Sequence, residues 1–171
     1  MQNNDAKEQS FIRLIKEYGP TITKVCYFYA VDSDDLNDLR QEVMINLWRG
    51  FDRYRGESSP STWIYRVSLN SCVSYFRKHK RHQSEYTSID SIPEIYDSGI
   101  EKPDRLREMY NLINRLDRVE KALILLWLSD RKYDDIADIM GIPRNTVASR
   151  LHRIKEKPVS YTHLRAHETR R

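Results

Sequence analysis

The sequence predicts an all-α fold with two small helical domains joined by a linker, the second a helix-turn-helix domain. Apolar residues recur at helical spacing along most of the 171 residues, and only five Gly and six Pro interrupt them. Charged residues make up 32% and aromatic residues 11% of the chain. This mixture is too charged for a membrane protein and too apolar for wholesale disorder.

The N-terminal segment is expected to form two helices that meet at a kink. Apolar residues follow a helical pattern from Phe11 to Tyr18, and the pattern resumes from Ile22 to Tyr29. Gly19 and Pro20 lie between the two stretches, and both residues disfavour a helix interior.

The next helix is expected to reach Phe51, since apolar residues recur at steps of three and four from Leu36 onwards. Asp32 or Ser33 can cap its first turn, and acidic residues there suit the helix dipole. A third helix is expected over residues 61–79, with Ser59 as cap and Pro60 at the first helical position.

Residues 83–103 contain two prolines and no sustained periodicity, which is typical of a linker. Helical patterns then follow over 106–116 and from Asp117 to Leu128, with Glu120 placed to complete an acidic capping box. The pattern ends with helices over Tyr133–Met140 and over residues 144–157.

The last two helices have the layout of a helix-turn-helix motif. Ile136 and Ala137 pack the first helix, Gly141 supplies the turn, and Val147 and Leu151 pack the second. Such a motif places the start of its second helix in the major groove of DNA. The groove-facing candidates are Arg144, Asn145, Thr146, Ala148, Ser149 and His152, and the phosphate-binding candidates are Arg150, Arg153, Lys155 and Lys157. A three-helix protein-interaction module is the alternative interpretation.

The charges alternate along the chain. Basic residues outnumber acidic ones by seven to two over 51–82 and by seven to four over 131–157, whereas 83–105 holds six acids and two bases. In the first basic segment, aromatic residues are interleaved with the cations, a pattern that suits single-stranded DNA. Two polyanion-binding modules joined by an acidic linker are therefore expected.

The remaining signals are negative or local. The two cysteines, Cys26 and Cys72, are far apart in the sequence and predict neither a zinc site nor a disulfide framework. Residues 1–16 carry no apolar core of the kind that a signal peptide needs, and the longest apolar run, Ala122–Leu128, is too short to span a membrane, so a cytoplasmic protein is expected. No phosphate loop, nucleophile elbow or metal motif is present, so no cofactor, metal or catalytic residue is expected.

The C-terminal residues do not continue the last helix. Residues 159–169 resemble, position for position, one reading frame of an adapter used to build sequencing libraries. Residues 158–171 are therefore interpreted as an artefactual tail. Without the tail the formal charge falls from +4 to +2, because it carries three arginines and one glutamate.

Two motifs resemble parts of one family. Residues 35–43 read Asp-Leu-Asn-Asp-Leu-Arg-Gln-Glu-Val and are followed by Leu47-Trp48, by Thr-Trp-Ile-Tyr-Arg-Val at 62–67 and by Asn70. This pattern closely resembles the second domain of bacterial sigma factors of the extracytoplasmic-function (ECF) group. Tyr-Asp-Asp-Ile-Ala at 133–137, Gly-Ile-Pro at 141–143 and Ser-Arg-Leu-His-Arg at 149–153 look like the fourth sigma domain.

The resemblance implies a division of the chain and a set of partners. Residues 1–82 would form the domain that binds core RNA polymerase and the minus-ten element, 83–103 the linker, and 104–157 the domain that binds minus-thirty-five DNA. The implied partners are the beta-prime coiled coil and beta flap of core polymerase, double- and single-stranded promoter DNA, and an anti-sigma factor. By the same resemblance the acidic linker threads the RNA exit channel, although a solvated spacer explains its charge equally well.

The resemblance also implies roles for individual residues. Asp38, Gln41 and Glu42 would dock the polymerase. Pro60 departs from the bulky residue often found there, and Trp63 suits the core as well as a base contact. The residues implied at the minus-ten element are Arg55, Ser59, Thr62, Trp63, Arg66, Asn70, Arg77, Lys78 and Arg81. A sigma factor, which performs no catalysis, is thus the leading hypothesis, and a stand-alone helix-turn-helix repressor or activator is the alternative.

Overall fold

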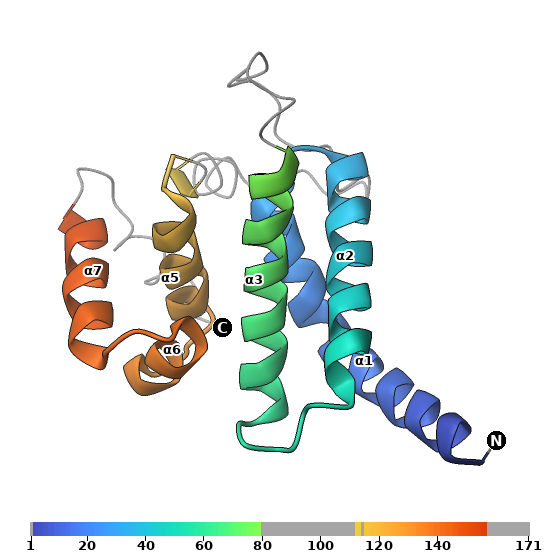
Figure 1. The fold of residues 1–171 in the computed structure, drawn as a ribbon. Coiled ribbons are helices and arrows are strands. Elements are labelled where there is room, and N and C mark those ends of the chain that lie inside the picture. The colour runs from blue at the N-terminus through green and yellow to red at the C-terminus, as the bar shows by residue number, and fades with distance from the viewer. Residues whose placement is uncertain (1, 80–111, 114, 157–171) are drawn as a thin grey trace, which may run out of the picture. The chain divides into compact units, whose positions relative to one another are not determined.

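The structure is a computed structural model and describes residues 2–79, 112, 113 and 115–156. The chain divides into two compact units, residues 1–89 and 90–171, and each is described by itself. Every element of the described residues is an α-helix (Figure 1). This confirms the predicted all-α class.

The first unit is a bundle of three helices, α1 (Gln2–Tyr29), α2 (Ser33–Phe51) and α3 (Pro60–His79). Each helix contacts the other two, and α2 and α3 lie side by side (Figure 1). The core is built from the apolar stripes that the spacing predicted. Its fully buried residues include Val25 and Cys26 of α1, Leu39, Val43 and Leu47 of α2, and Ile64 and Cys72 of α3.

The prediction of two separate helices is wrong, because α1 is a single α-helix from Gln2 to Tyr29 with Pro20 inside it. Proline removes one helical hydrogen bond and costs about 3 kcal/mol in a helix interior. Burial of apolar side chains on the C-terminal side, such as Ile22 and Val25, offsets this cost, since each contributes about 1.5 to 3 kcal/mol. Pro20 itself points to solvent.

Two of the predicted caps close the helices of the first unit. Asp32 is the N-cap of α2, and its carboxylate accepts a hydrogen bond of 2.8 Å from the backbone N–H of Asp35. Ser59 Oγ accepts from the backbone N–H of Thr62 at 3.1 Å, and Pro60 begins α3 as expected. These bonds satisfy N–H groups that have no partner within a helix.

The second unit contains α5 (Arg118–Leu128), α6 (Tyr133–Met140) and α7 (Arg144–Glu156). Residues 122–128 of α5 are all buried, so this helix forms the centre of the unit. Asp117 caps α5 and accepts hydrogen bonds from the N–H groups of Val119 and Glu120, at 2.8 and 2.9 Å. Gly141 ends α6 in the left-handed conformation, with φ of 65°, which gives the predicted turn of the helix-turn-helix.

Several expectations lie outside the described residues. They are the linker over 83–103, most of the helix over 106–116, the tail over 158–171, and the side chains of Arg81 and Lys157. Among the helices that are described, none combines the length and the apolar character needed to cross a membrane. The same residues hold no group of three or more His, Cys, Asp or Glu placed to bind a metal ion.

Candidate nucleic-acid and polymerase interfaces

The outer face of α2 carries the residues predicted to dock a partner. Asp38 and Gln41 are exposed, and Ile45 and Trp48 extend the same helical face with side chains that are 44% and 36% exposed. These four residues follow one another at steps of three and four, the spacing of neighbours on a helix surface. We call Asp38, Gln41, Ile45 and Trp48 the α2 face.

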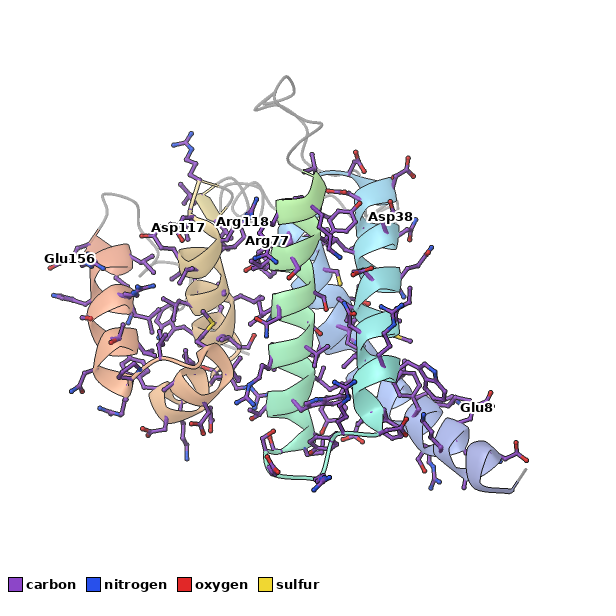
Figure 2. All side chains as sticks on the ribbon, in the orientation of Figure 1. Glu8, Asp38, Arg77, Asp117, Arg118 and Glu156 are labelled. Atoms are coloured by element: carbon purple, nitrogen blue, oxygen red, sulfur yellow. The ribbon has the colours of Figure 1, made fainter. Side chains whose placement is uncertain are left out.

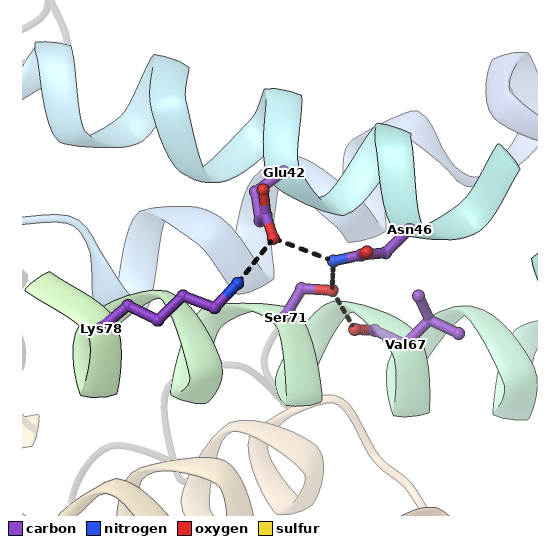
Figure 3. Close-up of polar contacts among 5 residues, drawn as sticks. All are labelled: Glu42, Asn46, Val67, Ser71 and Lys78. Carbon is purple, nitrogen blue, oxygen red and sulfur yellow. Dashed lines mark hydrogen bonds and ion pairs between the residues drawn. The ribbon is translucent and has the colours of Figure 1, made fainter. Parts of the chain in front are cut away.

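Glu42 lies to one side of the α2 face, against α3. Its Oε1 accepts a hydrogen bond of 3.4 Å from Asn46 Nδ2 and lies 3.9 Å from Lys78 Nζ. Asn46 also donates to Ser71 Oγ at 3.0 Å, and Ser71 donates in turn to the Val67 carbonyl at 2.8 Å (Figure 3). Glu42 therefore takes part in a polar network between α2 and α3, a role that its sequence position did not predict.

Asp38 is also in contact with α3. Its Oδ2 accepts a hydrogen bond of 3.3 Å from the hydroxyl of Tyr75, and Asp35 Oδ1 lies 3.1 Å from the same hydroxyl. Burial and the two carboxylates raise the pKa of Tyr75 well above its ordinary value. Figure 2 shows Asp38 near the beginning of α2. The neutral Tyr75 hydroxyl thus hydrogen-bonds Oδ2 of Asp38, while Oδ1 of Asp38 makes no hydrogen bond to Tyr75.

One side of α3 presents polar and basic residues to solvent. Asn70 and Arg77 are exposed, and Arg66 is half-buried. Because these residues are four and seven positions apart, they share one face of the helix (Arg77 is labelled in Figure 2). Lys78 is exposed but lies beside Glu42, at the edge of this face.

The loop between α2 and α3 and the first turn of α3 hold further predicted residues, in two different environments. Arg55 and Ser59 are exposed. Thr62 is buried, with 8% of its surface accessible, and its Oγ1 accepts a hydrogen bond of 3.0 Å from Ser59 Oγ. Ser59 Oγ is therefore hydrogen-bonded to both the hydroxyl and the backbone N–H of the buried Thr62.

Trp63 is half-buried and packed against the same loop. The Tyr54 ring stacks on the indole with a centroid distance of 4.8 Å and an interplanar angle of 22°. The Phe51 ring lies 6.5 Å away, and a Cβ added to Gly50 would come within 3.3 Å of Trp63 Cζ2. Tyr54 therefore covers one face of the indole.

In the second unit, α7 buries one face and exposes the other. Val147, Leu151 and Ile154 are buried against the unit. The predicted DNA-binding residues occupy the rest of the helix. Arg144, Asn145, Ser149, His152 and Arg153 are exposed, and Thr146, Ala148, Arg150 and Lys155 are half-buried.

Several of these side chains have protein partners. Arg144 Nε lies 3.1 Å from Asp134 Oδ1, and its guanidinium lies 5.9 Å from the centre of the Tyr133 ring. His152 Nε2 lies 3.3 Å from Glu156 Oε1 (Glu156, at the end of α7, is labelled in Figure 2). Lys155 Nζ lies 4.3 Å from the centre of the Trp127 ring, a cation–π contact between α7 and α5 that turns this lysine toward the unit.

The sequence interpretation did not identify three features of these surfaces. The exposure of Ile45 and Trp48 could be predicted only from their position on the side of the helix opposite the apolar stripe. Tyr54 contacts Trp63, nine residues along, and no local pattern predicts such a contact. Lys7 bridges to Asp52 with an Nζ–Oδ2 distance of 2.6 Å, across 45 residues.

Comparison with known proteins agrees with this architecture. The family model of Sigma-70 region 2 matches residues 14–82, and that of Sigma-70, region 4 matches residues 106–157. The ECF RNA polymerase sigma-E factor of Escherichia coli (strain K12) is 30% identical over 170 residues, covering 91% of this chain and 87% of the relative. The corresponding factor of Haemophilus influenzae is 29% identical over 169 residues, covering 91% of this chain and 88% of the relative.

Two solved structures share the fold. The sigma factor RpoE of Bartonella quintana, in complex with the anti-sigma factor NepR, matches with a TM-score of 0.67 and 23% identity, covering 86% of this chain and 91% of that chain. CnrH in complex with the cytosolic domain of CnrY gives a TM-score of 0.62 and 15% identity, over 86% of this chain and 84% of that chain. By its sequence relatives, the chain belongs to the ECF family of RNA polymerase sigma factors, which act in transcription initiation.

Proposed function

We propose that three surfaces of the chain divide the steps of initiation: the α2 face binds core polymerase, the loop and outer side of α3 bind the minus-ten strand, and α7 binds the minus-thirty-five duplex. The observation that carries the proposal is that α3 and α7 each bury one face in their unit and expose basic and amide groups on the other. Residues 1–82, 83–103 and 104–157 are the corresponding domains and linker.

For polymerase docking, the α2 face combines an exposed carboxylate and amide with the apolar surface of Ile45 and Trp48. Interfaces are often built with aromatic anchors at the centre and polar groups at the rim. We assign this face to the beta-prime coiled coil of core polymerase. Asp38 and Gln41 lead the contact, and Glu42 lies at its margin, because its carboxylate is engaged with Asn46 and Lys78.

For the minus-ten element, Arg55, Arg66 and Arg77 supply cations for the backbone of a single strand, while Asn70 can hydrogen-bond a base edge. Ser59 is exposed beside them. Thr62 contributes by holding Ser59 rather than by touching DNA. Lys78, Trp63 and Arg81 complete the proposed set.

For the minus-thirty-five element, α7 acts as the recognition helix of the helix-turn-helix. Arg144 and Asn145 lie in its exposed first turn, and their side chains match guanine and adenine edges in the major groove. Further along α7, the proposed groove-facing residues are Thr146, Ala148, Ser149 and His152. Arg150 and Arg153 neutralise phosphates, and these contacts fix the register of the helix on the duplex. Lys155 has a minor part in this contact, because its ammonium packs on Trp127.

DNA opening follows from binding alone and requires no catalytic group. An unpaired strand and an extruded base can bind the first unit only in the open state, so binding shifts the population toward that state. We also propose contact with the beta flap of core polymerase, and control by an anti-sigma factor. The second proposal is supported by the two solved complexes of proteins with this fold.

In-vitro transcription with purified core polymerase tests the proposal, using a chain that ends at Lys157 and a library of genomic templates. We expect transcripts with defined start sites that depend on the added chain. A stand-alone repressor or activator would bind duplex DNA without forming a complex with core. Absence of both core binding and promoter-specific transcripts would overturn the proposal.

A further inference from the structure

We infer that Tyr54 is a positioning residue for recognition of the unpaired base, because it fixes the shape of the loop that carries Arg55 and Ser59. This inference rests on the proposed minus-ten function of that loop. It assigns to Tyr54 a role that its place among basic residues does not indicate, since its ring stacks on Trp63.

The first anchor is a hydrogen bond that closes the loop on itself. The Tyr54 hydroxyl donates to the backbone carbonyl of Ser58 at 2.6 Å, four residues later in the chain. Only residues 55–57 project beyond this closure, and all three are exposed. Gly56 at their centre has a φ of 77°, which side chains other than glycine rarely adopt. The closure therefore defines a short, exposed tip that begins with Arg55.

The second anchor is the stack of the Tyr54 ring on Trp63. The near-parallel rings, 4.8 Å apart, join the loop to the first full turn of α3. Gly50 leaves room for the indole, because a Cβ there would lie 3.3 Å from Trp63 Cζ2. Since Tyr54 occupies one face of the indole, a base cannot stack on that face while the loop keeps this shape. Trp63 thus positions the loop by packing against Tyr54.

The two ends of the loop are held by contacts that do not involve the Tyr54 side chain. At the start, Asp52 pairs with Lys7 at 2.6 Å, and the Tyr54 N–H donates to the Gly50 carbonyl at 3.1 Å. At the end, Ser59 caps α3. Loss of the Tyr54 hydroxyl therefore frees the middle of the loop and leaves both ends attached. Such a loss should affect base selection without unfolding the unit.

Tyr54→Phe is the sharpest test, because it removes the hydroxyl and keeps the ring on Trp63. The assay compares the affinity of the holoenzyme for a set of promoter DNAs, opened at the minus-ten element, that differ only in the unpaired base. Loss of one hydrogen bond of ordinary strength predicts about a three- to tenfold fall in the ratio between the best and the worst base. Binding to core and to duplex minus-thirty-five DNA should stay at the wild-type level.

Two further variants make the result specific. Tyr18→Phe removes a tyrosine hydroxyl from the half-buried side of α1 and should leave base discrimination intact. Tyr54→Leu removes both anchors and should reduce discrimination further than Tyr54→Phe. Far-ultraviolet circular dichroism and the midpoint of thermal unfolding report whether each variant is folded.

The outcomes separate the inference from the function on which it rests. If the wild-type holoenzyme does not discriminate among bases at all, the proposed minus-ten function is wrong. If the wild type discriminates and Tyr54→Phe, folded and bound to core, discriminates equally well, the positioning role of Tyr54 is wrong. A loss of discrimination in both Tyr54→Phe and Tyr18→Phe would also contradict it.

Discussion

The first residue of α7, the proposed recognition helix, pairs with the preceding helix: Arg144 Nε lies 3.1 Å from Asp134 Oδ1. The two side chains are 59% and 75% exposed, so the ion pair itself adds little to stability. Its consequence concerns binding. To contact a base or phosphate through the nitrogen that faces Asp134, Arg144 must leave the carboxylate or share it.

Asp134→Asn should therefore strengthen duplex binding. The change frees Arg144 for its proposed base contact, so we expect tighter binding of the preferred sequence and, since no phosphate contact is added, a similar dependence of log affinity on log salt. Fluorescence anisotropy at several salt concentrations measures both quantities. Asp135→Asn is the matched control, since it removes the same charge from the same helical turn. Equal effects of the two substitutions would show that the pairing with Arg144 is irrelevant.

Arg144→Ala and Arg153→Ala should weaken duplex binding in different ways. Loss of a bidentate base contact by Arg144 costs about 1 to 3 kcal/mol on the preferred sequence and much less on others. Loss of a phosphate contact by Arg153 should weaken all sequences alike and reduce the salt slope by about one contact. Affinities for the preferred site and for single-base variants distinguish these patterns. A uniform loss in Arg144→Ala would contradict its base-reading role.

On α2, the double substitution of Asp38 and Gln41 by alanine should weaken core binding at least tenfold and leave duplex binding by α7 unchanged. Glu42→Gln should weaken core binding much less, because Glu42 faces Asn46 and Lys78. Titration of labelled chain with core polymerase measures the affinities. A larger effect from Glu42 than from the double substitution would place the docking surface on the α3 side of α2.

Lys121 should make the stability of the second unit depend on pH. Burial, assisted by the charge of Arg118, lowers the pKa of Lys121 to about 8. Between that value and its unfolded pKa of about 10.4, the unfolded chain binds more protons, so stability rises with pH over this window. The shift corresponds to at most about 3 kcal/mol.

Lys121→Met should remove this rise and stabilise the unit most below pH 8. The substitutions Trp48→Phe and Trp63→Phe leave Trp127 as the single tryptophan. Its fluorescence then reports the unfolding of the second unit in urea. The difference in stability between the lysine and methionine chains should shrink from pH 7 to pH 10.5. A difference that is constant with pH would show that Lys121 keeps its charge at little cost in the folded unit.

Local signals in the sequence predicted much of the fold. Capping residues such as Asp32 and Asp117 bond the first turns of their helices, and Gly141 adopts the left-handed turn. Two separate helices do not form around Pro20, because the tertiary packing of α1 outweighs the low helix propensity of proline. Periodicity selects the buried face of a helix, but it does not say which neighbour each exposed residue meets.

The candidate surfaces were accordingly predicted in part. The sequence indicated α2, the segment after it and α7, and the structure shows most of the named residues exposed or half-buried. It did not predict that Thr62 is buried or that Glu42 is linked to Asn46. Nor did it predict the stack of Tyr54 on Trp63. Each of these depends on side-chain placement within the bundle, which helical spacing alone does not determine.

Promoter opening is the most direct test of the central claim, that this chain directs core polymerase to open promoter DNA. Potassium permanganate modifies unpaired thymines, and it can be applied to a promoter obtained by the transcription screen, in the presence of core polymerase and the chain ending at Lys157. We predict reactive thymines at the minus-ten element only when both proteins are present. Unreactive thymines in a complex that contains core polymerase, this chain and the promoter would contradict the claim.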